Sequence, residues 1–152
     1  MNNPKYLYKS DKKHTLFEFI STGPKGRIKK VIQYTETSTK NVFNLGFGDF
    51  NETTKGIDDL SVSNNGDSLK VLATVASTVY AFLEKHPDAW IIATGSTAAR
   101  NRLYRMGITK YIAEINQDFS VYGYSEDGIW EEFTTGVAYE AFLLTKKTDI
   151  FA

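Results

Sequence analysis

The chain contains no cysteine, and this absence excludes disulfide bonds, thiol nucleophiles and cysteine-ligated zinc from its chemistry. It has no apolar run approaching the roughly 20 residues that a membrane helix needs. Residues 1–14 also lack the apolar core of a signal peptide. Because a cysteine-free chain suits a reducing compartment, we expect a cytoplasmic protein with no membrane partner.

An excess of charge of one sign is also missing, since 18 Lys and Arg residues balance 18 Asp and Glu residues. The net charge therefore does not point to nucleic acid, to a membrane or to an acidic partner. The two signs are nevertheless separated along the chain. Residues 1–30 carry eight basic side chains against two acidic ones, whereas residues 113–140 carry seven acidic side chains and no Lys or Arg. If these segments lie apart in space, the molecule has a charge dipole.

The length of 152 residues is that of one domain, and 41% hydrophobic and 14% aromatic residues can supply its core. We see no internal repeat, low-complexity tract or linker in the sequence. We therefore expect residues 1–152 to form a single domain, in which residues 1–13 are a candidate for a mobile basic segment.

Two neighbouring segments, 14–22 and 27–37, are rich in β-branched and aromatic residues and flank the turn signal GPKG at 23–26. The segment 41–50 continues with Phe and Leu at alternate positions. We therefore expect three successive antiparallel strands. In the second strand, one face carries Ile28, Ile32 and Tyr34, and the opposite face carries Lys29, Gln33 and Thr35.

Apolar residues then recur at helical spacing over residues 72–83. Either Asn65 or Asp67 is positioned to cap the N-terminus of this helix, and Pro87 ends it. The sequence thus predicts one long helix, packed on a core, between the first three strands and the rest of the chain.

The apolar run at 89–95 predicts a central strand that is buried on both faces. A second helix follows and ends at Gly107, which suits a left-handed C-terminal cap, and Thr109 then opens a further short helix. Three strand-like segments come after it, at 119–124, 129–133 and 139–145, with the turn signal SEDG between the first two. The order βββαβαββ indicates an α+β domain, with a largely antiparallel sheet and two main helices packed mainly on one face.

The strongest candidate site is the stretch ATGSTAARNRLYRMG at 93–107. Gly95, Ser96 and Thr97 form a small-residue turn before a helix, where unpaired N–H groups and the helix dipole favour anions. Side chains on the helix complete the candidate anion site: Arg100, Arg102, Tyr104 and Arg105. Guanidinium groups suit phosphate because they make planar, two-pronged contacts. Helix geometry allows at most two of these arginines to serve one small anion.

The same corner has a purely structural interpretation. Ser96 or Thr97 would cap the helix, and Leu103 and Met106 would be buried. The arginines would then pair with carboxylates of the C-terminal strands, notably Glu131, Glu132 or Glu140. The stretch also lacks the glycines and lysine of a P-loop and the three glycines of a dinucleotide fold.

Clustered carboxylates in and around the polar stretch 51–66 could hold Mg²⁺ or Ca²⁺. The cluster consists of Asp49, Glu52, Asp58, Asp59 and Asp67, and the candidate ligands are its four aspartates. The spacing does not match an EF-hand, and turn, capping and solvated roles account for all five carboxylates. We therefore expect no metal, and a metal-dependent hydrolase ranks last among the functions considered.

Motifs for nucleophilic or acid–base catalysis are absent from the sequence, and His14 and His86 are its only imidazoles. We therefore expect no cofactor and favour binding over catalysis, although the sequence leaves enzymatic activity open. Residues 5–14 interleave Tyr6 and Tyr8 with lysines, a mix that can stack bases and neutralise phosphates. A solvated strand face and a mobile basic terminus explain the same residues.

Three stretches together resemble a family of small uncharacterised proteins of about this length in Bacteroidetes-type bacteria: FEFISTGPKGRIKKVIQY, FNLGFGDF with NNGDSLKVLATVASTVYAF, and ATGSTAARNRLYRMGI. The resemblance spans nearly the whole chain. It implies a single-domain, cytoplasmic, bacterial protein, and it brings no known activity, cofactor, partner or site residue.

Two functions of different classes follow from these observations. The first is binding of a phosphate-containing ligand, a nucleotide or a nucleic-acid backbone, at Gly95, Ser96 and Thr97 and on the arginine-rich helix that follows. The alternative is a non-catalytic protein interaction module that uses an aromatic-rich sheet surface and forms a homo-oligomer or binds a protein partner. The alternative predicts a contiguous exposed apolar patch, with the arginines paired to carboxylates.

Overall fold

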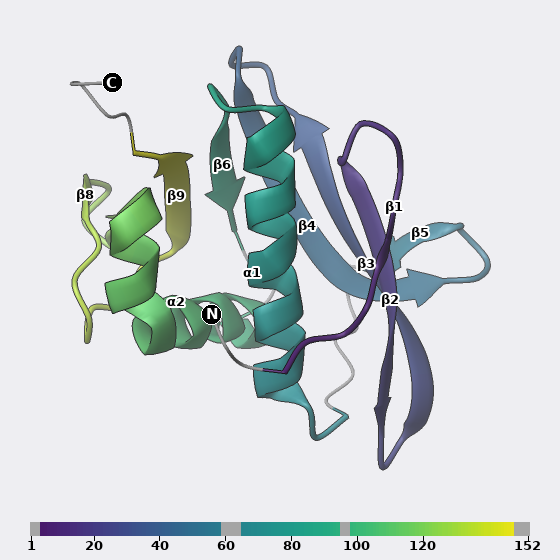
Figure 1. Cartoon of the computed structure of the whole chain (residues 1–152). Helices are drawn as coiled ribbons and strands as arrows, with labels where there is room; N and C mark the ends of the chain where they lie inside the picture. Colours follow the sequence, from purple (N-terminus) through teal and green to yellow (C-terminus); the bar gives the residue numbers. More distant parts are fainter. Residues whose placement is uncertain (1–3, 59–64, 95–97, 148–152) are drawn as a thin grey trace.

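A sheet of nine strands, with two helices against it, makes up the described part of this computed structural model, residues 4–58, 65–94 and 98–147 (Figure 1). The helices are α1 (Ser68–Lys85) and α2 (Ala98–Asp118). The strands are β1 (Lys9–Ser10), β2 (Leu16–Gly23), β3 (Gly26–Glu36), β4 (Val42–Asn51), β5 (Gly56–Asp58), β6 (Trp90–Ala93), β7 (Phe119–Tyr124), β8 (Trp130–Glu132) and β9 (Ala141–Lys146).

The strands are ordered β1-β2-β3-β4-β6-β9-β7-β8, and β5 pairs with the last residues of β4. Every pairing is antiparallel except that of β4 with β6, where α1 provides the crossover that parallel neighbours require. This arrangement confirms the predicted α+β class and its largely antiparallel sheet. The short strands β1 and β5 were not expected from the sequence, because two or three residues carry no readable period.

Alternate residues of β2, β3 and β4 form the face of the sheet that packs against the helices. Phe17, Ile32 and Phe47 lie side by side across the three strands and are almost fully buried. Tyr34, on the same face, stacks on Phe82 of α1 with ring centroids 4.3 Å apart. Burial raises the pKa of Tyr34, so its hydroxyl is neutral where it meets Thr78 of α1.

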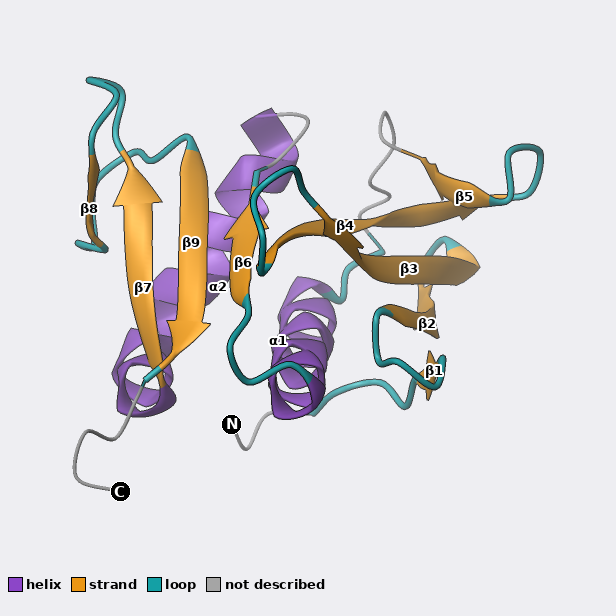
Figure 2. Ribbon diagram, turned by 90° about the horizontal axis from the view of Figure 1, so that it is seen from above, coloured by secondary structure: helices purple, strands orange, loops and turns teal. Residues whose placement is uncertain are grey.

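The opposite face of the sheet has no helix against it in the described part of the chain (Figure 2). In β6, Ile91 and Ala93 face the helices and are buried, whereas Trp90 and Ile92 on the opposite face are only half-buried. The prediction that this strand is buried on both faces was therefore wrong. A continuous apolar run indicates a central strand, but it cannot tell whether both faces are covered.

The second helix differs from the prediction at Gly107 and at Met106. Gly107 is not a C-terminal cap, because α2 continues to Asp118 and leaves helical geometry only at Tyr111, with φ −111° and ψ 17°. A Cβ atom at Gly107 would lie 3.0 Å from a methyl carbon of Leu72, so this glycine lets α2 approach α1 closely. Met106, expected to be buried, is 49% exposed.

Neither α1 nor the described part of α2 is long and apolar enough to span a membrane.

The segment before β1 is attached to the domain in the described residues from Pro4 onward. The ring of Tyr6 is buried and stacks on Phe19 of β2, while its main-chain N–H donates to Thr74 Oγ1 of α1 at 2.8 Å. The basic strand β1 and the acidic strand β8 stand at opposite ends of the strand order. The separation of the two charged segments in space, on which a charge dipole depends, is therefore present.

Replacing Gly123 with alanine is expected to lower the free energy of unfolding by about 1–3 kcal/mol, because overpacking a buried site costs that much. The added Cβ would lie 2.4 Å from carbon atoms of the Tyr139 ring, which is itself buried. Gly56 is the matched control, since an added Cβ there meets nothing within 4 Å. Urea unfolding of Gly123→Ala and Gly56→Ala measures both changes, and equal losses would contradict the packing of Tyr139 on β7.

Candidate functional site

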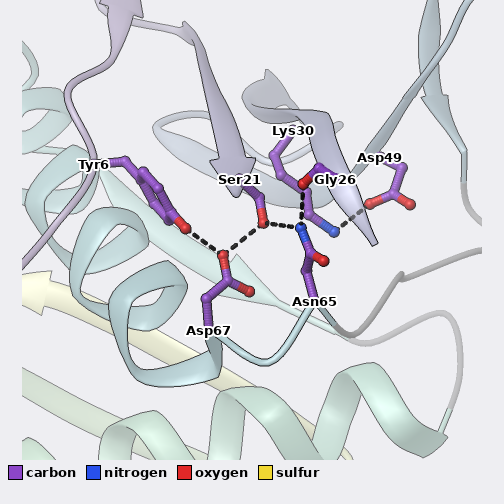
Figure 3. Close-up of polar contacts among 7 residues, drawn as sticks. All are labelled: Tyr6, Ser21, Gly26, Lys30, Asp49, Asn65 and Asp67. Carbon is purple, nitrogen blue, oxygen red and sulfur yellow. Dashed lines mark hydrogen bonds and ion pairs between the residues drawn. The ribbon is translucent and has the colours of Figure 1, made fainter. Parts of the chain in front are cut away.

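A cluster of polar side chains surrounds the start of α1 (Figure 3). Asp67 occupies the N-cap position, yet its side chain makes no capping hydrogen bond. One of its carboxylate oxygens instead accepts hydrogen bonds from the hydroxyls of Tyr6 and Ser21, each at 2.5 Å. The expectation that Asp67 caps the helix is thus met by position only, because these two hydroxyls hold its carboxylate away from the helix N–H groups.

Asn65 completes this polar cluster, which consists of Tyr6, Ser21, Asn65 and Asp67. Asn65 is 1% exposed, and its side-chain amide donates to the carbonyl oxygen of Gly26 at 2.9 Å and to the Ser21 hydroxyl at 3.3 Å. Its amide oxygen accepts from the main-chain N–H of Lys25 at 2.7 Å. The cluster therefore joins the N-terminal segment, the β2–β3 turn and the start of α1.

A buried ion pair lies close to this cluster on the same face of the sheet (Figure 3). Lys30 and Asp49 are direct partners in the β3–β4 register, and the lysine ammonium contacts the Asp49 carboxylate. The Lys30 side chain is 1% exposed. Because the desolvation cost of burying two charges can exceed their mutual attraction, the pair is weak evidence for stability, although removing one partner would leave a buried charge uncompensated.

The carboxylates considered for a metal are spread over different environments. Asp49 is paired with Lys30, and Asp67 accepts the two hydroxyls. Asp58 is the β5 register partner of Asp49. Asp59 lies outside the described residues. Among the residues that the structure describes, no group of three or more His, Asp or Glu side chains is arranged to hold a metal ion.

The predicted arginines lie at a pocket of about 260 Å³, the arginine pocket, where the first two turns of α2 face the β7–β8 turn and the β8–β9 loop. It is lined by Ala98, Asn101, Arg102, Arg105, Glu126, Ala138, Tyr139 and Glu140. Asn101 donates from its side-chain amide to the carbonyl oxygen of Tyr139 at 2.8 Å, which fixes one wall to the other. The structure thus brings together Arg102 and Arg105, which stand three positions apart on one helix face.

Neither arginine is paired with a carboxylate within the described part of the chain, where the ion pairs involve Lys29, Lys30 and Lys55. Glu140, one of the partners that a purely structural role would need, lines the pocket without forming an ion pair to Arg102 or Arg105. The pocket therefore offers two guanidinium groups and two carboxylates that do not neutralise one another by direct contact.

The remaining residues of the predicted anion site are placed differently. Gly95, Ser96 and Thr97 lie outside the described residues. Arg100 belongs to the first turn of α2, but its side chain is not among those described. Tyr104 is buried in the core, where it lines an apolar cavity between α1 and α2 instead of the arginine pocket. A step of one residue turns a helix by about 100°, which separates Tyr104 from its neighbour Arg105.

Apart from Glu140, the residues of the facing wall of the pocket were not predicted from the sequence. Glu126, Ala138 and Tyr139 come more than twenty positions after Arg105 in the sequence, so no local spacing links them to the arginines. Asn101 was within reach, since it precedes Arg105 by four residues and so shares its helix face. Lys30 also carried a signal, because a lysine interrupts the apolar face that Ile28 and Ile32 define.

The model of a family of unknown function, DUF6934, matches residues 2–147. Because the match covers nearly all of the sequence, the chain belongs to this family. No curated protein and no solved structure matches the chain. Membership confirms the resemblance to an uncharacterised family, and it adds no activity, ligand or partner to what the geometry offers.

Replacing Tyr6 with phenylalanine is expected to lower the free energy of unfolding by about 1–3 kcal/mol, the usual cost of leaving buried polar groups without a partner. The change removes the hydroxyl that bonds Asp67 and the main-chain N–H of Thr22. Tyr8→Phe is the matched control, because no hydrogen bond of the Tyr8 hydroxyl is found among the described residues and its ring is only half-buried. Chemical denaturation of both variants should show a loss for Tyr6→Phe alone, and a neutral Tyr6→Phe would refute the anchoring role of the cluster.

Proposed function

We propose that the protein binds a phosphate-containing ligand, a nucleotide or a phosphate of a nucleic-acid backbone, in the arginine pocket. One observation carries the proposal: Arg102 and Arg105 line the same pocket and have no carboxylate partner in the described part of the chain. Charged side chains at a pocket without an ion partner are available to a ligand of opposite charge. Arginine suits phosphate because its donors match the spacing of two phosphate oxygens.

The position of the pocket at the start of α2 supports an anion for a second reason. Ala98, the first residue of α2, forms part of its lining. The first turn of a helix carries roughly half a positive charge, because its backbone dipoles align and its N–H groups lack partners within the helix. A phosphate bound beside Arg102 and Arg105 would therefore also be attracted by the helix end.

The two carboxylates of the pocket favour a nucleotide over inorganic phosphate. Glu126 and Glu140 line the same space as the arginines, and a carboxylate repels an anion but accepts hydrogen bonds from hydroxyl and amino groups. A nucleotide presents both kinds of group, with its phosphate at one end and sugar hydroxyls or base amino groups at the other. The volume of about 260 Å³ is slightly below the usual 300–1,000 Å³ of small-molecule sites and suits part of a nucleotide.

We extend the proposal to the residues directly before α2. Gly95, Ser96 and Thr97 can offer main-chain N–H groups and two hydroxyls to the same phosphate, since they immediately precede Ala98. Arg100 belongs to the first turn of the same helix and is a further candidate contact. On this proposal the protein acts in the cytoplasm of a Bacteroidetes-type bacterium, a reducing compartment that suits a chain without cysteine.

A second candidate function is association with a protein partner or with a second copy through the helix-free face of the sheet. Two pairs of aromatic rings on this face favour it. The ring centroids of Trp90 and Tyr122 are 6.1 Å apart, and those of Tyr124 and Trp130 are 5.0 Å apart. Trp130 is 41% exposed and its three ring partners on this face are half-buried, so the four rings together can contribute to an apolar contact surface. This function predicts that the arginines of the pocket are paired with carboxylates. Arg102 and Arg105 agree less well with it, because neither has a carboxylate partner in the described part of the chain.

The double variant Arg102→Ala/Arg105→Ala is expected to bind adenosine or uridine monophosphate at least about tenfold more weakly than the original protein, because it loses the charge-assisted contacts to the phosphate. Titration calorimetry at low salt measures the affinity. The control is Arg27→Ala/Lys40→Ala, which removes the same charge from two exposed positions outside the pocket. It should keep the original affinity.

Equal weakening in the variant and the control would show that the nucleotide is attracted by overall charge and would overturn the proposal. Absence of binding to the original protein would overturn it as well, and sedimentation at several concentrations would then examine the second candidate. A self-association that Trp130→Ser abolishes would support the helix-free face as an interface. A monomer at all concentrations would leave only a different protein as its partner.

A further inference from the structure

A groove, the lysine groove, lies at the end of the sheet opposite the arginine pocket. In Figure 1 the N-terminal segment passes the side of α1 and the edge of β2 at this end of the sheet. The volume of the groove is about 560 Å³, which is within the 300–1,000 Å³ range of small-molecule sites. Residues from four parts of the chain line it: Lys5, Tyr6, Leu7, Lys9, Glu18, Phe19, Ile20, Lys29 and Lys70.

The groove has a strong excess of positive charge. Four lysines line it against a single carboxylate, that of Glu18, which leaves three positive charges in excess. Glu18 is itself engaged, since Lys29 pairs with it at 3.2 Å. Lys5 donates a hydrogen bond to the Ser77 hydroxyl at 3.4 Å, and Lys70 lies over the ring of Tyr6. Neither lysine has a carboxylate partner among the described residues.

Contacts that do not use the lysine ammonium groups hold the groove in shape. Tyr6 ties the N-terminal segment to Asp67 and Thr74 of the α1 region, and β1 pairs with β2 at Glu18. Beyond that pairing no strand lies along this edge of β2 in the described part of the chain. The main-chain N–H of Ile20 faces this open edge, because it has the same orientation as the N–H of Thr22, which donates to Tyr6.

These features point to a compact anion with several linked phosphates. Lysine ammonium groups bind phosphate as point charges, and the four here come from three elements, so one ligand must offer several negative groups to meet them. The wall does not suit single-stranded nucleic acid, because Tyr6 and Phe19 are buried and cannot stack on bases. A concave groove also fits a small ligand better than it fits a flat lipid surface.

We propose that the lysine groove binds a chain of two or three linked phosphates, free or as part of a nucleoside di- or triphosphate. Lys5, Lys9 and Lys70 hold the phosphates, and the N–H of Ile20 supplies a main-chain donor. The site is separate from the arginine pocket, which lies against β7–β9 at the other end of the sheet. The two proposals therefore stand or fall independently.

The test is titration calorimetry with tripolyphosphate at low salt on the full chain. Lys5→Gln/Lys9→Gln/Lys70→Gln is expected to bind at least about tenfold more weakly, which corresponds to about 1.4 kcal/mol of binding free energy. The charge-matched control is Lys12→Gln/Lys13→Gln/Lys40→Gln, three exposed lysines outside the groove, and it should bind within about threefold of the original. Arg102→Ala/Arg105→Ala should bind tripolyphosphate unchanged.

Further arms of the experiment identify the ligand. Orthophosphate should bind at least about tenfold more weakly than tripolyphosphate, because it reaches fewer lysines. ATP should match tripolyphosphate if only the phosphates are recognised and exceed it if the nucleoside contributes. Lys9→Glu changes one exposed side chain, so it tests the groove even if the triple variant does not fold, and it should weaken binding more than Lys12→Glu does.

Three results would overturn the proposal. The first is absence of tripolyphosphate binding to the original protein. The second is an equal loss in the groove variant and in its charge-matched control. The third is tighter binding to oligonucleotides or to anionic phospholipid vesicles than to tripolyphosphate, which would make the groove part of a larger polyanion surface.

Discussion

Both helices pack on the same face of the sheet, and this constraint determines where every other part of the molecule can lie. The strands bury alternate residues beneath α1 and α2, and the two helices must share the space above them. Gly107 allows the close approach of α2 to Leu72 of α1 that this sharing needs. Tyr104 and Tyr111, seven positions apart, both face inward. The opposite side of the first two turns is left to Arg102 and Arg105, which meet the loops between β7 and β9.

The same constraint explains why polar groups on the helix-covered face are informative. Lys30 and Asp49 stand in the row of positions that elsewhere holds Phe, Ile and Leu, and they neutralise each other there. At the start of α1, the Asp67 side chain accepts hydrogen bonds from Tyr6 and Ser21 and does not cap the helix. These contacts anchor the N-terminal segment, and through it they set the position of the lysine groove. A residue at the N-cap position of α1 thus helps to position the lysine groove, which extends beyond the helix.

Much of the fold follows from periodicity, and the parts that do not follow have clear physical reasons. Alternating apolar residues predicted β2, β3 and β4, and helical spacing predicted α1, because burial on one face imposes these periods. The extent of α2 was misjudged because Gly107 serves close packing, and a sequence does not distinguish a packing glycine from a capping one. Lys30 could have been recognised in the sequence, because it interrupts an apolar strand face. The hydrogen bond between Tyr6 and Asp67 could not have been predicted, since 61 positions separate the two residues.

The two proposed phosphate sites stand toward opposite ends of the strand order, on a chain whose acidic and basic segments are also separated. Proton–nitrogen correlation spectra of the labelled protein during titration with uridine monophosphate would locate the first site residue by residue. The account predicts the largest shifts at the amides of Asn101, Arg102 and Arg105 on α2 and of Glu140 on the facing loop. Shifts confined to Trp90, Tyr122 and their neighbours on the helix-free face, or no shifts at all, would contradict the claim that this protein holds a nucleotide phosphate in its arginine pocket.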